Sequence, residues 1–420
     1  MPKYFLILIF PFYLNAQKTL LYEDNTYETN IKTVLVYPAS GGSSLARGLQ
    51  VPVIELGESL RLEFDDLSAK YEQYHVKVIH CDINWLPSKI NAIEYVNNFN
   101  DEIINDYAVS QSTKVPYYHY SFEVPAVKIS GNYLLVVWRD GNKDDLIITK
   151  RFLAVENKIG VMTYIHQATD PEFRKTKQQI DFDLSYGNFP LMAPKEDLKV
   201  VIKQNFRWDR TIRNLKPRGV FEAEKKLEYR FLGNENLMSA GNEFRFFDGR
   251  STFQRGFFID KIQLGTVDDI WVSVQKDRSI YTYVEAIDQN GLFSPQNLET
   301  RNTTTEADYP FFTFTLKVKE FEDKKVYVNG GFNNWKQNAI NLMEYDPKFE
   351  SYVATIQLKQ GIYNFDFVVV DENGHADEEL LEGNFADTEN IYEIIVYNKA
   401  QAGRTDRIVG YKAVQCNPKR

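Results

Sequence analysis

The sequence contains little cysteine, histidine and methionine: two Cys, five His and five Met in 420 residues. So few thiols and imidazoles exclude a multi-cysteine zinc module and a scaffold held together by many disulfides. The chain also lacks an excess of positive charge, since 49 Lys and Arg face 58 Asp and Glu, a net charge of −9. We therefore expect no nucleic-acid partner and no attraction to anionic membranes.

Long hydrophobic runs are absent after the first residues. Residues 4–14 are almost continuously apolar, Lys3 precedes them, and Ala16 offers a small residue for cleavage. The run is shorter than the ~20 apolar residues of a membrane-spanning helix, so it predicts a signal peptide cleaved after Ala16. We expect a soluble periplasmic protein with no direct membrane insertion. That compartment permits a disulfide between Cys81 and Cys416, and the sequence leaves their pairing open.

Aromatic residues, in contrast, are abundant, with 29 Phe and 26 Tyr, and this composition favours strands over helices. Apolar and polar residues alternate with period two, or form short buried runs, in all parts of the chain. These segments are residues 31–37, 60–64, 74–80, 130–138, 146–153, 179–186, 198–204 and 280–286. A short helix is compatible only with residues 93–107. The pattern predicts an all-β protein of tandem, immunoglobulin-like β-sandwich domains.

Turn signals and one polar linker, residues 301–308, divide the predicted strands into segments of domain size. The third segment has the ~100 residues of one immunoglobulin-like sandwich. The predicted order is a signal peptide at 1–16, an N-terminal β-sandwich at 17–155, a second β-sandwich at 156–305, a third at 306–400 and a C-terminal tail at 401–420.

No group of residues has the spacing that catalysis or metal binding requires. Residues 41–44, Gly-Gly-Ser-Ser, lack the second glycine of a nucleophile elbow. His75 and His80 are close to Cys81 but point to opposite faces of a strand, so they are not zinc ligands together. The acidic residues 371–379 do not follow the spacing of a calcium loop. We therefore predict a non-enzymatic protein without metal or cofactor.

Residues 326–335, Val-Tyr-Val-Asn-Gly-Gly-Phe-Asn-Asn-Trp, are followed by Met343 and by residues 352–368, which contain Gly-Ile-Tyr-Asn-Phe. This series resembles the early-set immunoglobulin-like modules related to glycogen-binding domains. The resemblance implies that the turn packs Trp335 against the strand beginning near Tyr363. It also keeps open an alternative function, a periplasmic or surface glycan-binding β-sandwich protein.

The N-terminal region contains a denser series of short motifs. His-Cys-Asp-Ile-Asn-Trp at residues 80–85 is followed by Ile-Asn-Asp-Tyr at 104–107, Tyr-Tyr-His-Tyr at 117–120 and Ser-Gly-Asn-Tyr at 130–133. This series resembles the type IX secretion system plug proteins of Bacteroidetes. The resemblance implies a periplasmic protein that docks on the outer-membrane β-barrel translocon and closes its periplasmic opening while the pore is idle. It implies no catalytic residues.

Interfaces are anchored mostly by aromatic side chains, so aromatic residues near these motifs are candidates for partner binding. The candidates are Asp82, Asn84, Trp85, Tyr107 and Tyr120, on the interpretation that they face the surface. Two other functions compete with the plug. A glycan-binding protein would need a groove lined by several exposed aromatics, and a cargo of the same secretion system would need a C-terminal sorting domain, which residues 414–420 do not resemble.

Overall fold

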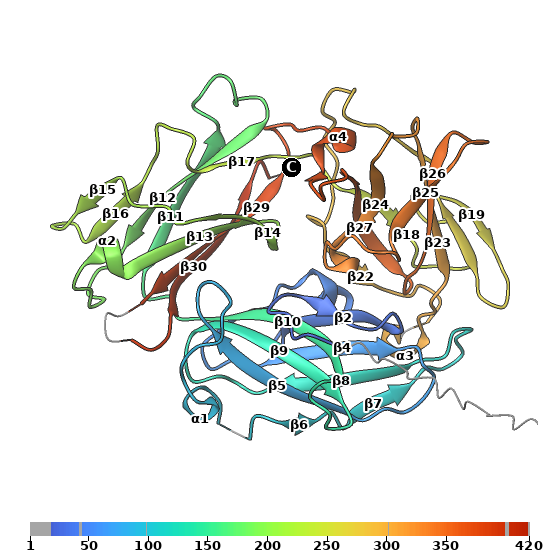
Figure 1. Ribbon diagram of the computed structural model, residues 1–420, viewed down its shortest axis with the longest axis horizontal. Helices are drawn as coiled ribbons and strands as arrows, with labels where there is room; N and C mark the ends of the chain where they lie inside the picture. The colour runs from blue at the N-terminus through green and yellow to red at the C-terminus, as the bar shows by residue number, and fades with distance from the viewer. Residues whose placement is uncertain (1–17, 42–43, 98, 301, 400–402, 419–420) are drawn as a thin grey trace, which may run out of the picture.

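The computed structural model describes residues 18–41, 44–97, 99–300, 302–399 and 403–418, so the predicted signal peptide lies outside the described residues. Nearly all regular structure is strand (Figure 1), which confirms the predicted all-β class of tandem β-sandwiches. Each α-helix in the described chain is a single turn, including the one found where residues 93–107 were expected to be helical. The short helices are α1 (Ala92–Tyr95), α2 (Pro194–Asp197), α3 (Thr303–Glu306) and α4 (Glu379–Glu382), with 3-10 turns at η1 (Ser44–Leu49) and η2 (Gly331–Asn333).

The first sandwich packs two sheets around one hydrophobic core, to which alternate residues of the predicted strands contribute. One sheet has the order β1 (Asn25–Thr26), β10 (Leu146–Val155), β9 (Gly131–Arg139), β5 (Tyr74–Cys81) and β6 (Glu102–Ile103), with β3 (Val53–Glu55) parallel to β10. The other has the order β2 (Ile31–Pro38), β4 (Leu60–Asp66), β8 (Tyr118–Val124) and β7 (Asp106–Val109). Strands β9 and β10, which cover the predicted segments 130–138 and 146–153, pair as an antiparallel hairpin.

The second sandwich is built from two distant parts of the sequence. One sheet has the order β11 (Gly160–Gln167), β12 (Lys177–Ser185), β16 (Lys226–Tyr229) and β15 (Gly219–Phe221), with β17 (Leu237–Ser239) beside β12. The other has the order β14 (Arg207–Arg213), β13 (Leu198–Gln204), β29 (Asn390–Asn398) and β30 (Arg407–Cys416). The two C-terminal strands therefore complete a sandwich that begins more than two hundred residues earlier.

The third sandwich is formed by the chain between those two parts, in a sheet of eleven strands around a core of mainly aromatic and β-branched side chains. The main path has the order β18 (Arg245–Asp248), β27 (Gly361–Val370), β24 (Lys325–Asn329), β25 (Leu342–Asp346), β26 (Ser351–Gln357), β23 (Phe311–Lys317), β20 (Asp269–Val272) and β19 (Ile259–Gln263). Beside this path lie β21 (Gln275–Lys276), β22 (Phe293–Pro295) and β28 (Ala376–Asp377).

The domain boundaries that follow from the sheets therefore differ from the predicted boundaries. Residues 401–420 were expected to be a tail, but β30 is an edge strand paired along its whole length with β29. The predicted boundary at 305 is also wrong, because β18 to β22 join the third sandwich. Alternation shows that one face of a strand is buried, but it does not identify the neighbouring strand. The third sandwich is an insertion within the second.

Residues 280–286, predicted as a strand, contain no strand in the structure. Ile280 and Val284 are mostly exposed, while Tyr283 packs on Phe385 and donates a 2.5 Å hydrogen bond to Glu243. A sequence with β-propensity forms a strand only where a neighbouring strand pairs with it. This segment instead crosses the surface of the third sandwich.

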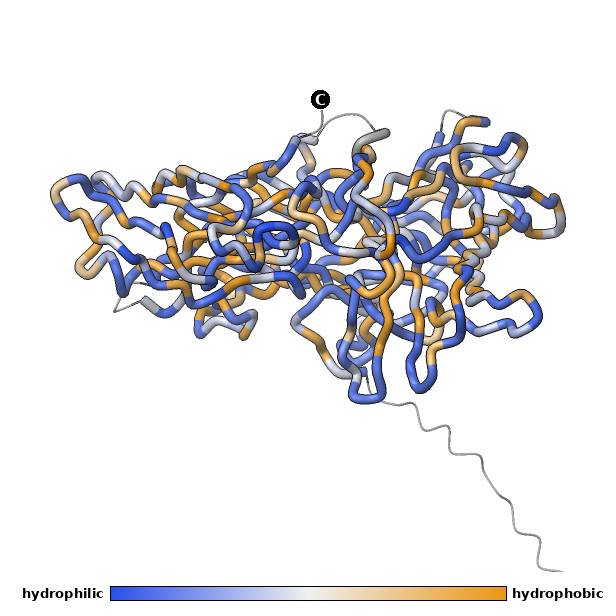
Figure 2. The backbone as a smooth tube through the Cα atoms, turned by 90° about the horizontal axis from the view of Figure 1, so that it is seen from above, coloured by the Kyte–Doolittle hydropathy of each residue, from blue (hydrophilic) through white to orange (hydrophobic). Residues whose placement is uncertain are grey.

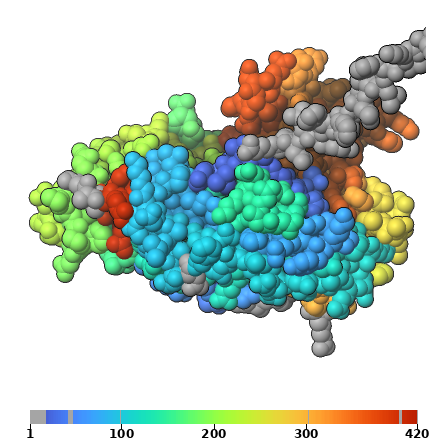
Figure 3. Space-filling model, turned by 60° about the horizontal axis from the view of Figure 1, so that its bottom comes forward, coloured from blue at the N-terminus to red at the C-terminus, as the bar shows by residue number. Residues whose placement is uncertain are grey.

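The three sandwiches contact one another in pairs. The second and third sandwiches lie side by side above the first (Figure 1), and the first faces the viewer when the molecule is seen from below (Figure 3). Hydrophobic and hydrophilic residues are interspersed in every lobe (Figure 2), as expected when strands alternate between core and solvent. A hydrophobic cluster that includes Trp138 of the first sandwich and Ile395 of the second joins these two lobes. This is why both faces of β29 are buried.

Candidate functional site

The predicted partner-binding residues after β5 form a tight turn. The carboxylate of Asp82 accepts the backbone N–H groups of Asn84 at 2.8 Å and of Leu86 at 2.9 Å. Asn84 is exposed at the tip. Trp85, expected at the surface, is 3% exposed and packs edge-on against Trp208 of the second sandwich, with ring centres 4.9 Å apart. The motif at residues 80–85 therefore joins two sandwiches.

The other two predicted residues differ in exposure. Tyr107 lies on the edge strand β7 and is 46% exposed. Tyr120 was expected at the surface but is fully buried, because its ring stacks on Phe64 and its hydroxyl donates to the carbonyl of Glu72 at 2.9 Å. The structure does not bring the five predicted residues together into one patch.

An exposed aromatic cluster does exist at the edge of the first sandwich. Tyr71 contacts Tyr107 with ring centres 4.8 Å apart, and Tyr118 lies 6.1 Å from Tyr107. All four residues of β7 are exposed, and β7 is the last strand of its sheet. An unpaired strand edge beside exposed aromatic rings is a surface on which another protein can dock. We refer to Tyr71, Tyr107, Tyr118 and β7 as the tyrosine edge.

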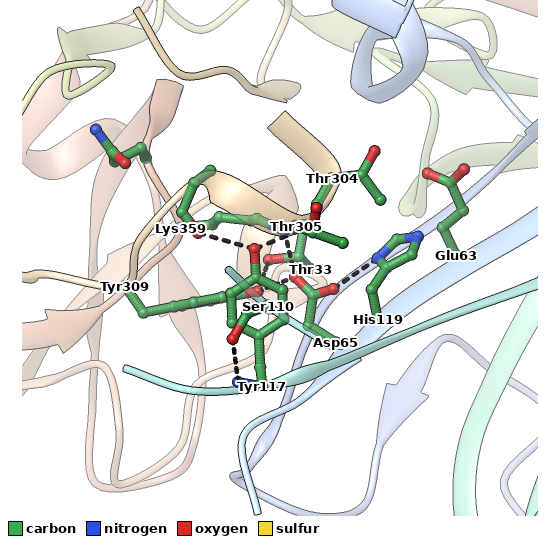
Figure 4. A network of polar contacts seen from close by, with 12 residues as sticks. Thr33, Glu63, Asp65, Ser110, Tyr117, His119, Thr304, Thr305, Tyr309 and Lys359 are labelled. Atoms are coloured by element: carbon green, nitrogen blue, oxygen red, sulfur yellow. Dashed lines mark hydrogen bonds and ion pairs between the residues drawn. The ribbon is translucent and has the colours of Figure 1, made fainter. Parts of the chain in front are cut away.

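A buried polar network fixes the first sandwich to the third (Figure 4). Asp65 of β4 accepts hydrogen bonds from Lys359 at 2.7 Å and Tyr309 at 2.5 Å, both of the third sandwich. His119 of β8 lies 2.7 Å from the second carboxylate oxygen. Thr33 of β2 also bonds the Tyr309 hydroxyl, at 2.6 Å. Sequence reasoning missed this network, because no local pattern marks a lysine that becomes buried.

The charges of this network are mutually stabilised. Burial raises the pKa of Asp65, but the ammonium of Lys359 and the hydrogen bond with His119 outweigh that effect and leave the pKa below its ordinary value. Burial lowers the pKa of Lys359, and Asp65 opposes this change. A buried ion pair with additional hydrogen bonds is costly to separate, since either partner alone would be an uncompensated buried charge. The network therefore holds the two sandwiches in one orientation.

A cavity of about 610 Å³ lies where the three sandwiches meet. Its wall includes Trp85 and Arg151 of the first sandwich, Trp208 of the second and Trp335 of the third. Ligand sites commonly occur at domain junctions, in cavities of ~300–1,000 Å³. We refer to this space as the junction cavity.

Trp335 was expected to pack on the strand that begins near Tyr363, but this position is taken by Phe332, whose ring meets Tyr363 edge-on at 5.8 Å. Trp335 is only partly buried, and the guanidinium of Arg207 lies 3.9 Å from its ring centre. Phe244 is 5.5 Å away. The turn thus presents Trp335 to the second sandwich rather than to its own core.

The described residues contain no group of three or more His, Cys, Asp or Glu that could hold a metal ion. Cys81 and Cys416 are both free and buried, in different hydrophobic clusters. Burial raises the pKa of the Cys81 thiol to about 12 and that of Cys416 to about 11, so both are poor nucleophiles near neutral pH.

None of the helices in the described chain is long and apolar enough to cross a membrane.

The fold defines a multidomain, immunoglobulin-like β-sandwich protein. Residues 31–156 match the family model of the type 9 secretion system plug protein 1st domain, and residues 315–399 match that of the glycogen recognition site of AMP-activated protein kinase. These are the two families that the sequence motifs resembled, in the same order along the chain. Both families are of non-catalytic kinds.

A solved structure covers nearly the whole chain. The crystal structure of a hypothetical protein from Parabacteroides merdae is 29% identical, covers 95% of this chain and 100% of its own, and superimposes with a TM-score of 0.87. Trypsin-activated alpha-2-macroglobulin from Escherichia coli gives 8% identity and a TM-score of 0.16 over 96% of this chain and 30% of its own, which is too low to carry an argument. No curated protein matches the chain.

Proposed function

We propose that this protein is a non-enzymatic periplasmic plug that binds the outer-membrane translocon barrel of the type IX secretion system and closes its periplasmic opening. The observation that carries the proposal is the match of residues 31–156 to the plug-protein first domain. This match links the chain to type 9 secretion, and the closing of the barrel is the step that we add.

The way the sandwiches are joined supports a blocking role. Each pair of sandwiches is linked by polar contacts: Asp65 with Lys359, Asn132 with Tyr397 at 2.8 Å, and Arg207 with Glu378. A body whose parts are already fixed loses little conformational entropy when it binds, so more of its contact energy appears as affinity. A plug has to resist displacement as one piece, and these contacts provide that property.

We propose the tyrosine edge as the docking surface on the first sandwich. Of the five residues predicted from sequence, Tyr107 belongs to it and Asn84 is exposed elsewhere on the same sandwich. Trp85 and Tyr120 are buried and would act only by supporting the turn and the sheet. A stable interface buries more than ~1,200 Å² in total, so the tyrosine edge would form the centre of a larger contact.

The test of the interface is a pull-down from outer membranes with tagged protein. Tyr71→Ala together with Tyr107→Ala should lose most of the captured barrel, because central aromatic side chains carry most of the binding energy. Tyr164→Ala is the matched control, since Tyr164 is 38% exposed but lies on the second sandwich. Equal capture by all variants would exclude the tyrosine edge as the interface.

The closing function is tested by deleting the gene. The barrel should remain assembled while entry of a large, normally excluded glycopeptide antibiotic increases, because an occupied opening depends on stoichiometric binding and not on turnover. Unchanged permeability, combined with no barrel in the wild-type pull-down, would contradict the proposal.

Glycan binding remains the second candidate, because residues 315–399 match a glycogen-recognition family. The covered face of Trp335 argues against a stacked glucose unit, since Arg207 occupies the position that a sugar ring would need. We expect wild type and Trp335→Ala to give the same null result with maltoheptaose in calorimetry. The variant should lose only about 1–2 kcal/mol of stability with the cation–π contact. Saturable binding that disappears in Trp335→Ala would make glycan binding the better function.

A further inference from the structure

The junction cavity has a charge opposite in sign to that of the whole chain. Among the described residues, seven Lys and Arg line it but only three Asp and Glu, while the complete sequence has a net charge of −9. Positive charge concentrated in a low-dielectric cavity raises the local concentration of anions. The cavity is thus the place in this acidic protein where an anion would be favoured.

Five of the seven cations are already neutralised by carboxylates. Lys203 pairs with the buried Glu393 at 2.9 Å, and Arg207 pairs with both Asp209 and Glu378 at 2.5 Å. The others are Arg47 with Glu63, Lys150 with Asp24 and Lys336 with Glu23. Arg207–Glu378 and Lys336–Glu23 join two sandwiches, and the other pairs lie within one sandwich. Each of these cations thus already has an acidic partner.

Arg151 and Arg213 are different, because neither forms an ion pair with any described residue. Arg151 donates Nε–H, at 2.9 Å, and one Nη2–H to the carbonyl of Tyr22. Arg213 donates to the carbonyl of Ile83 at 3.0 Å and to the hydroxyl of Thr211 at 3.4 Å. A guanidinium has five N–H donors, so each arginine keeps three N–H groups that are not hydrogen-bonded to the described chain.

Both guanidiniums lie near the ring of Trp208. They lie 5.6 and 5.8 Å from the centre of the Trp208 ring, and Arg151 lies 4.4 Å from that of Trp85. Burial lowers the pKa of Arg151, and the charge of Arg213 adds to this effect against the opposing effect of Asp24. Two guanidiniums that form no ion pair and keep unused N–H donors are an arrangement that an oxyanion can stabilise.

We propose that the junction cavity binds a small organic anion whose carboxylate or phosphate group is held by Arg151 and Arg213. The volume of about 610 Å³ exceeds that of a bare phosphate, and the indole groups of Trp208 and Trp335 provide apolar wall for the body of the ligand. The proposal goes beyond the plug function and requires none of it.

The test is a titration of the full-length mature protein followed by tryptophan fluorescence and calorimetry, with four probes. Phenyl phosphate and benzoate distinguish a phosphate from a carboxylate ligand, inorganic phosphate tests whether the body contributes, and benzyl alcohol is the neutral control. We expect saturable binding of at least one of the two aromatic anions, weaker binding of inorganic phosphate, and none of benzyl alcohol.

Variants assign the site. Arg151→Gln and Arg213→Gln should each raise the Kd at least about tenfold, because each removes charge-assisted hydrogen bonds. Arg151→Lys should lose the bidentate geometry and bind at intermediate strength. Arg218→Gln is the control, since Arg218 is exposed outside the cavity and should leave the Kd unchanged. Melting curves identify any variant that fails to fold.

Absence of saturable binding by both aromatic anions would overturn the proposal. Equal affinity of wild type and both glutamine variants would also overturn it, because the anion would then bind elsewhere. Binding of an oligoglutamate peptide without binding of either small anion would show that the cavity receives a protein segment instead.

Discussion

Glu378, in a loop of the third sandwich, connects this sandwich to the second. Its carboxylate accepts hydrogen bonds from Arg207 at 2.5 and 3.0 Å and also bonds Arg210, both on β14 of the second sandwich. Burial raises the pKa of Glu378, but the two arginines outweigh it and lower the pKa to about 2. One side chain therefore links two sandwiches through a charge that survives moderate acid.

We expect Glu378 to contribute a defined part of the acid sensitivity. The pKa in the folded state, about 2, lies below the ordinary value of 4.5 that applies after unfolding. The stabilisation is therefore complete above about pH 4.5 and is lost as the pH falls towards 2. Urea melts of wild type and Glu378→Gln between pH 2.5 and 7 measure this. The variant should be less stable at pH 7, by about 3–5 kcal/mol, and its stability should fall less steeply with acid.

Asp366 lies close enough to affect the same measurement, since burial and the charge of Glu378 raise its pKa well above 3.8. Asp366 therefore titrates at higher pH, so between pH 2 and 4.5 the difference between wild type and Glu378→Gln reports mainly Glu378. Parallel curves for wild type and Glu378→Gln in that region would contradict the assignment.

At the scale of elements, β29 and β30 determine whether the second sandwich exists. Strand β29 pairs with β13 over seven residues and with β30 over most of its length. Tyr392 of β29 is fully buried and bonds Gln178 of the opposite sheet at 2.6 Å. The end of the chain is thus part of a core and not an appendage.

Truncation after residue 402 should therefore destabilise the protein strongly. It removes the buried side chains of Ile408 and Val409 from the core. It also exposes the edge of β29, and an unpaired strand edge promotes aggregation. Soluble yield and melting temperature measure the effect. Lys412→Ala is the control, because Lys412 is exposed on the same strand. A truncated protein that melts like wild type would show that the C-terminal residues are a dispensable tail after all.

Local sequence patterns predicted individual strands well, and the arrangement of those strands poorly. Strands β2, β4, β5 and β12 appear where alternation placed them, because half-burial acts on each strand separately. The pairing of β13 with β29 depends on residues nearly two hundred positions apart, for which a single sequence has no signal. The same limit explains residues 280–286, where propensity is present but a neighbouring strand is missing.

The site was harder to predict for a related reason. The aromatic motif containing Trp85 was found, but its exposure depends on Trp208, which comes from another sandwich. Tyr107 is exposed because β7 happens to be the last strand of its sheet. Asp65 and Lys359 are 294 residues apart, and each looks like an ordinary surface charge in its own segment.

At the scale of the whole molecule, the three sandwiches form a triangle with contacts between every pair (Figure 1). The junction cavity is lined by residues of all three. Domains in one chain often move relative to each other, because their interfaces are small and polar. Here Lys359 and Asp65 are almost completely buried at such an interface. The expected behaviour is that of one cooperative unit.

Lys359→Met tests this cooperativity, because it leaves the carboxylate of Asp65 buried without its cation. We expect a loss of about 3–5 kcal/mol and, in guanidinium melts followed by two probes, transitions that no longer coincide. The double variant Lys359→Met, Asp65→Asn should regain part of the stability, because it no longer contains the unpaired buried carboxylate of Asp65. Lys319→Met, an exposed position on the same sandwich, should change nothing. Coincident, unshifted transitions in Lys359→Met would show that the network is not what unites the sandwiches.

The insertion of the third sandwich within the second also affects the order in which the protein is made. Gln204 and Tyr392, which contact each other across β13 and β29, are 188 residues apart. If the chain folds from its N-terminus, the edge of β13 therefore stays unpaired until the last strands have been made. Only a complete chain can close that edge. In a truncated chain the edge of β13 stays exposed to proteases. We therefore expect truncated chains to be degraded before they bind a partner.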